Sequence, residues 1–156
     1  MSQELERFLT LFDGLVQSTN SWLELTPAEK LEWVPVENPN MKFGDRISTI
    51  TIKSVYIHTI VGETGWARLL KDCDDGADLK PPPANRELTK ELMASDDFVA
   101  DAMKLHRENM ALFGSYDDAR LARRMKWSGR EWTVMGFLWA IYSHRSYHLG
   151  NIDIYL

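Results

Sequence analysis

The chain has 156 residues and a formal net charge of −5. This length fits one domain spanning residues 1–156, and the acidic balance argues against nucleic acid or an anionic membrane as the main partner. Cys73 is the one cysteine in the sequence, so no internal disulfide can form and we expect a cytoplasmic protein. The N-terminus shows no secretory signal pattern, and the longest apolar run, 135–142, is far shorter than the roughly 20 residues of a membrane span.

Two long helices are predicted in the N-terminal half of the chain. Over residues 3–17 apolar residues recur at three- and four-residue steps, which is typical of one helix face, and polar residues 18–20 are expected to end that helix. A short helix is predicted after Thr26, where threonine, proline and glutamate follow the order of an N-terminal cap. The second long helix is predicted over residues 45–71. Its β-branched early part is also compatible with a strand, but the apolar spacing favours a helix.

Two further long helices are predicted in the C-terminal half. Residues 72–94 contain an acidic loop and three successive prolines, which are typical of a connection, with a short helix expected over 87–93. The third long helix is predicted over 95–113, with serine as the N-cap and glycine after its end. Polar residues 115–132 follow, and the fourth helix begins near Thr133. Because the connection over 72–94 is long, we expect an all-α four-helix bundle that is not a simple up-and-down one.

The fourth helix carries a pair of histidines that suggests metal binding. His144 and His148 are four residues apart, which places both imidazoles on one side of a helix, one turn apart. Both fall on the predicted inward face, and neutral imidazole is a common ligand of zinc, nickel, copper and iron. His58, near the apolar stripe of the second long helix, offers a third nitrogen donor. A histidine pair at this spacing is also common in core packing and on surfaces, so a structural interpretation remains open.

Other residues have both a chemical and a structural interpretation. His106 on the third helix could be a fourth ligand or a proton carrier, but a hydrogen-bonded, partly buried histidine is the preferred interpretation. Glu63 could reach the cleft, although a solvated carboxylate or one that supports a ligand is expected. Cys73 lies among three aspartates, whose charges disfavour a reactive thiolate. The residue after His144 is Arg145, so the glutamate of the H-E-x-x-H protease motif is absent.

Two stretches resemble the DinB/YfiT-like superfamily, and the resemblance follows the helix order over nearly the whole chain. The closing stretch HRSYHLGNIDIYL, which begins at His144, resembles the family's last helix with its pattern H-x-x-x-H-x-G-Q. The stretch from His58 to Trp66 resembles the second helix, where a lone histidine is followed by tryptophan about two turns later. Asn151 stands where the family usually has glutamine. We expect this shorter amide to alter a hydrogen bond to a ligand but not to remove the metal ion.

The resemblance implies a bundle with a long crossover connection, often a homodimer, and one divalent ion held by His58, His144 and His148. Zinc, nickel and iron suit three imidazoles equally well. Because characterised enzymes of the superfamily use low-molecular-weight thiols, the resemblance implies a metal-dependent transferase that activates such a thiol for attack on an electrophilic small molecule. Two alternatives remain: a metal-dependent hydrolase that uses metal-bound water, and a non-catalytic, stress-related binding protein.

Overall fold

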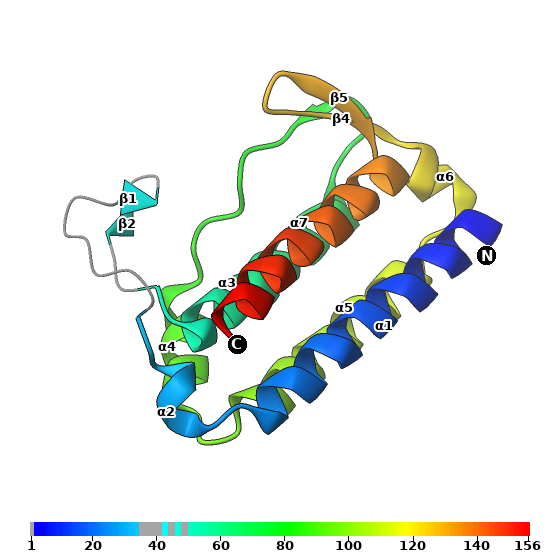
Figure 1. Ribbon diagram of the computed structural model, residues 1–156. Coiled ribbons are helices and arrows are strands. Elements are labelled where there is room, and N and C mark those ends of the chain that lie inside the picture. The colour runs from blue at the N-terminus through cyan, green and yellow to red at the C-terminus, as the bar shows by residue number, and fades with distance from the viewer. Residues whose placement is uncertain (1, 35–41, 44–45, 48–49) are drawn as a thin grey trace.

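Four long helices form the body of the protein in a computed structural model that describes residues 2–34, 42–43, 46–47 and 50–156. These helices are α1 (Gln3–Leu25), α3 (Ile52–Asp72), α5 (Phe98–Gly114) and α7 (Val134–Tyr155). Both α1 and α3 pack against α5 and α7, so α1 and α3 occupy opposite corners of the bundle. In Figure 1, α3 and α5 run in the same direction, which the long connection between them permits. The predicted four-helix bundle with a crossover connection is confirmed.

Short elements lie at the ends of the bundle and in its connections. The helices are α2 (Ala28–Leu31), α4 (Arg86–Ala94) and α6 (Asp118–Ala122), and the strands are β1 (Lys42–Phe43), β2 (Arg46–Ile47), β3 (Ala77–Asp78), β4 (Arg124–Trp127) and β5 (Arg130–Thr133). β4 and β5 form an antiparallel hairpin, with β3 parallel to β4. The hairpin turn has positive φ at Ser128 and Gly129, as a two-residue turn with the twist of a hairpin requires. The sequence pattern of 115–132 did not predict this hairpin.

The core consists of two apolar clusters. In the first, Phe8 stacks on Phe12 with ring centroids 5.3 Å apart and meets Phe113 and Trp139 edge-on. The second cluster, which includes Tyr56 and its neighbours on α3, lies toward the start of α3 and the end of α7. The aromatic and branched side chains that recur along α1, α3 and α7 therefore hold these helices in fixed relative positions.

The first helix continues eight residues beyond its predicted end, because its polar residues find partners without leaving the helix. Thr19 Oγ1 donates to the carbonyl of Leu15 at 2.8 Å, and Asn20 Oδ1 accepts a 2.6 Å hydrogen bond from the hydroxyl of Tyr56 on α3. Thr26 does not cap α2, since its hydroxyl donates to the carbonyl of Trp22. Polar residues that are typical of helix ends thus remain within the helix, because they form hydrogen bonds that the sequence pattern does not show.

The second long helix begins later than predicted. Thr51 is its N-cap: Thr51 Oγ1 accepts from the amide of Ser54, and Ser54 Oγ accepts from the amide of Thr51. Ile47 belongs to β2 instead of the helix, so the strand alternative was correct there, while Asp45 lies outside the described residues. This reciprocal capping box satisfies amides at the start of α3 and defines its first turn.

The third long helix also begins later than predicted. Asp97 caps α5 by accepting from the amide of Ala100, whereas Ser95 ends α4 and donates its hydroxyl hydrogen bond to Asp101. Gly114 is the last residue of α5 and not the residue after its end. The fourth long helix begins where predicted, with Thr133 as its N-cap. None of the helices in the described ranges combines the length and apolar character that crossing a bilayer requires.

Candidate metal centre

Three histidines from two helices converge at one point. His58 comes from α3, and His144 and His148 come from adjacent turns of α7; one ligand atom from each lies within 4.8 Å of the other two. The ring centroid of His58 lies 5.5 Å from that of His144 and 5.2 Å from that of His148. Nε2 of His148 lies 3.2 Å from Nε2 of His144. All three predicted ligands are therefore brought together.

The donor set fits a divalent metal ion. Nitrogen ligands about 2.0–2.1 Å from a tetrahedral ion lie roughly 3.3 Å from one another, which is close to the 3.2 Å between His144 and His148. In the described part of the chain, no carboxylate or thiol joins this group of three. Three imidazoles would leave coordination positions for a small ligand, which is the feature that separates catalytic from closed structural zinc sites.

Partial or full removal from solvent disfavours the protonated form of two of these imidazoles. The pKa of His148 is lowered to about 4, first because its side chain is buried and then because His144, His58 and Arg145 disfavour a second positive charge nearby. Desolvation also lowers the pKa of His144, with Glu63 opposing the shift and Arg145 adding to it. Both rings are therefore unprotonated at neutral pH, which is the form that binds a metal ion.

The predicted inward position holds for His148 and is wrong for His144. His148 is 5% exposed, whereas His144 is exposed at the surface of α7. The inward stripe of this helix passes through Ile141, Arg145 and His148, so His144 lies at its edge, where α7 meets α3. The three histidines consequently form a site that opens to the outside of the bundle instead of one enclosed by it.

Asn151 contacts the outer nitrogen of His148. Its side-chain amide nitrogen lies 3.4 Å from Nδ1 of His148, one turn further along α7. If Nε2 binds a metal ion, Nδ1 carries the proton, and the amide oxygen of Asn151 can accept it after the amide rotates. The shorter amide at this position therefore still reaches the imidazole of His148.

Glu63 is neither solvated nor directed at the three histidines. Both its side chain and that of Arg145 are only 1% exposed, and they form two hydrogen bonds, from Nε to Oε1 at 2.7 Å and from one terminal nitrogen to Oε2 at 2.6 Å. Sequence reasoning overlooked Arg145 as a partner. The signal that could have found it is the arginine's position on the inward stripe of α7, because a buried charge requires an opposite one.

His106 is fully buried on α5 and lies outside the three-histidine group. Its Nε2 is 3.0 Å from Oδ1 of Asp13 on α1, and its ring meets Phe12 edge-on at 5.5 Å. Desolvation lowers its pKa, although the hydrogen bond to Asp13 opposes that shift. His106 is thus a buried histidine with a carboxylate partner, which agrees with the structural interpretation of this residue.

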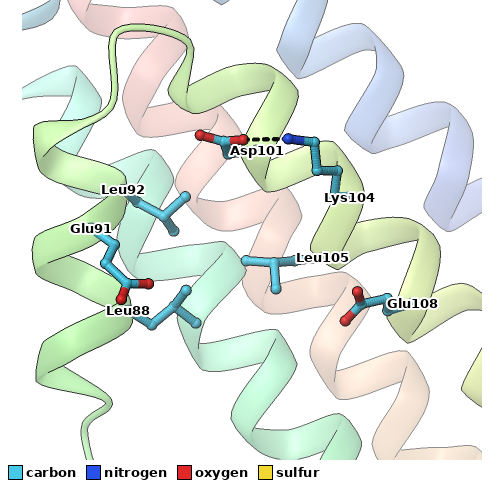
Figure 2. A pocket seen from close by; sticks show the side chains of 7 residues that line it. All are labelled: Leu88, Glu91, Leu92, Asp101, Lys104, Leu105 and Glu108. Carbon is cyan, nitrogen blue, oxygen red and sulfur yellow. Dashed lines mark hydrogen bonds and ion pairs between the residues drawn. The ribbon is translucent and has the colours of Figure 1, made fainter.

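A pocket between α4 and α5 is separate from the histidines. It has a volume of about 370 Å³, with Leu88, Leu92 and Leu105 among its lining residues. Figure 2 shows Asp101 and Lys104 at its edge, joined by an ion pair of 2.7 Å. None of its lining residues belongs to the three-histidine group, so the candidate metal centre is defined by its donors and not by this pocket.

The fold and the three histidines agree with one family. The chain belongs to the DinB superfamily, whose family model matches residues 5–152. Among solved structures it is similar to YfiT from Bacillus subtilis, with a TM-score of 0.65 and 15% sequence identity over 99% of this chain and 87% of that one. YfiT is described as a probable metal-dependent hydrolase with an unusual four-helix bundle topology. At this identity the likeness concerns the fold. No curated protein matches the chain.

The family assignment confirms the resemblance to the DinB/YfiT-like superfamily that the two stretches suggested. They contain His58 on α3 and the pair His144 and His148 on α7, and the structure brings these stretches side by side. The matched range includes all three histidines as well as Glu63 and Arg145. The three histidines therefore lie within the part of the chain that belongs to the DinB superfamily.

Proposed function

We propose that the protein binds one divalent ion, zinc, nickel or iron, through His58, His144 and His148 and uses it to activate a small nucleophile. The observation that carries the proposal is the convergence of three imidazoles, each offering a nitrogen within 4.8 Å of the others. A metal ion held there would act as a Lewis acid that lowers the pKa of a group bound at its open positions. The histidines themselves serve as ligands and are assigned no proton transfer.

The nucleophile that we propose is a low-molecular-weight thiol, which attacks an electrophilic small molecule in a metal-dependent transfer reaction. Both candidate bases are already engaged: Glu63 pairs with Arg145, and His106 with Asp13. A free thiol has a pKa of about 8.5, against about 15.7 for water, so a thiol needs far less help to lose its proton. Among the described residues, neither Glu63 nor His106 joins the three histidines, so no free base lies beside the site to deprotonate water. We therefore favour the thiol as the nucleophile.

Hydrolysis by water is the second candidate. It is supported by the description of YfiT, which shares the fold, as a probable metal-dependent hydrolase. Hydrolysis places a greater demand on a nearby base, and such a base would have to come from the substrate or from Glu63 after release from Arg145.

A non-catalytic, stress-related binding protein is the third candidate. The cytoplasmic location, the homodimer and the small-molecule substrate remain predictions.

The test compares metal-loaded wild type with His148→Ala and with the neighbouring surface variant Ser143→Ala. Consumption of an aryl halide is followed with and without a thiol such as glutathione or cysteine, next to a screen of ester and amide substrates. We expect thiol-dependent consumption in wild type and Ser143→Ala and only background in His148→Ala. Turnover unchanged in His148→Ala would reject a role for the site. Hydrolysis without thiol would favour the second candidate, and metal binding with neither activity would favour the third.

A further inference from the structure

We propose that the buried ion pair between Glu63 and Arg145 is a positioning device, which holds α3 against α7 so that His58 reaches His144 and His148. This inference rests on the proposed metal site, because it concerns the geometry of the ligands. It assigns Glu63 and Arg145 no contact with the metal ion or with a substrate. Their role is to set the separation of the two helices that carry the three histidines.

The ion pair joins the same two helices as the metal centre and lies close in sequence to the histidines on both. Glu63 follows His58 by five residues on α3, and Arg145 directly follows His144 on α7. Five residues of an α-helix correspond to a rise of about 7.5 Å, so the ion pair and His58 lie within one and a half turns of each other. A change in the spacing of α3 and α7 at the ion pair would therefore change the approach of His58.

The arginine is held on more than one side. Its guanidinium carbon lies 5.4 Å from the ring centroid of Tyr56, two residues before His58, and the Tyr56 hydroxyl in turn donates to Asn20 of α1 at 2.6 Å. The two parallel hydrogen bonds to Glu63 constrain both distance and angle, which a single hydrogen bond does not. The orientation of α7 is thus tied to α3 directly and to α1 through Tyr56.

Stability alone is a poor explanation for this ion pair. Removing two charges from water is expensive, and hydrophobic replacements of similar volume are often neutral or stabilising. One terminal nitrogen of Arg145 is also buried and has no hydrogen-bond partner among the described residues, which adds to the cost of keeping the charge there. What the pair supplies is a defined geometry, and a metal site needs its ligands placed to within about 0.2 Å.

The experiment separates positioning from stability with two double variants. Glu63→Leu with Arg145→Met removes the ion pair but retains side-chain volume. Thr64→Val with Asn109→Leu is the matched control, because it removes a buried 3.1 Å hydrogen bond between α3 and α5, a pair of helices that does not hold the ligands together. Each protein is titrated with Co²⁺ while the visible absorption of the bound ion is recorded, and metal-free samples are unfolded in urea.

We expect the ion-pair variant to bind Co²⁺ at least about tenfold more weakly than wild type, with an altered absorption spectrum, while its urea midpoint stays near that of wild type. The control should keep the affinity and spectrum of wild type. Wild-type affinity and spectrum in the ion-pair variant would overturn the inference and leave the proposed function intact. Failure of wild type to bind Co²⁺, Zn²⁺ and Ni²⁺ would instead overturn the proposed function.

A second variant keeps the test decisive if the first does not fold. Arg145→Lys retains the positive charge and loses the planar fork that makes two hydrogen bonds to one carboxylate. We expect weaker Co²⁺ binding and an altered spectrum in this variant too. If Arg145→Lys is folded and binds Co²⁺ as wild type does, the geometry of the ion pair does not position the ligands and the inference is wrong.

Discussion

Nε2 of His144 lies 3.2 Å from Nε2 of His148, one turn away on the same helix. This separation follows from the i, i+4 spacing and from two side chains that turn toward each other. The third nitrogen comes from His58 on α3, so its approach depends on how α3 packs on α7. Two ligands of the candidate metal centre are therefore placed by the local chain, and the third is placed by tertiary packing.

Replacing His144 by alanine should remove bound metal without unfolding the protein. The side chain is exposed, so the change in the free energy of unfolding should stay within about 0.5 kcal/mol. Untagged wild type should contain about one equivalent of zinc, nickel or iron per chain, measured by elemental analysis, and His144→Ala should contain almost none. Ser143→Ala serves as the control. Wild type that stays metal-free after reconstitution with each of these ions would contradict the prediction.

Acidification should destabilise the metal-free protein. Burial lowers the pKa of His148 from its ordinary 6.5 to about 4, so between these values the unfolded chain binds a proton that the native protein does not. Stability rises with pH wherever the unfolded state binds more protons. From this group, the free energy of unfolding should fall by about 2 kcal/mol from pH 7 to pH 5 and level off below about pH 4. His106, whose pKa burial also lowers, acts in the same direction.

Urea unfolding at pH 7 and pH 5 in the presence of a chelator measures this loss. In His148→Asn the part due to His148 disappears, so the difference in unfolding free energy between the two pH values should shrink. An equal difference in wild type and in His148→Asn would show that the His148 imidazole does not titrate as its burial predicts.

Truncation of Phe8 should be among the most destabilising single changes in α1. Its side chain is fully buried and contacts Phe12, Phe113 and Trp139, which come from three helices. Phe8→Ala should lower the free energy of unfolding by about 3–5 kcal/mol through lost burial and a cavity. The matched change Leu11→Ala, at a side chain that is 46% exposed, should cost much less. Chemical denaturation compares the two, and equal losses would contradict the assigned core.

Two glycines of α3 should respond differently to alanine. Within the described part of the chain, a Cβ at Gly62 would meet nothing within 4 Å, whereas one at Gly65 would lie 3.0 Å from Cγ of Pro82 in the crossover connection. Gly62→Ala should stabilise the protein by about 0.5–1 kcal/mol, because alanine loses less backbone entropy in a helix. Gly65→Ala should give up that gain by forcing Pro82 away. Thermal unfolding midpoints of the two variants test this prediction, and that of Gly62→Ala should be the higher. A higher midpoint for Gly65→Ala would show that Pro82 does not constrain this position.

The elements that sequence reasoning located well are those with strong local signals. The apolar period of α7 and its threonine cap predicted the helix start, and the short helix in the crossover connection was expected at the position of α4. The extension of α1 past Asn20 was missed because the partner of that amide, Tyr56, lies 36 residues away. The β4–β5 hairpin was missed because its short strands are stabilised by pairing with each other and with β3.

The sequence is enough to place His144 and His148 one turn apart, since helical periodicity is a property of the local chain. Through the family resemblance it also indicated His58 as their partner. Helix packing, in contrast, exposes His144 at the surface and pairs Glu63 with Arg145 instead of leaving it free beside the histidines. The physical reason is that the latter contact joins side chains 82 residues apart, whose meeting depends on how two helices pack and which of their faces turn inward.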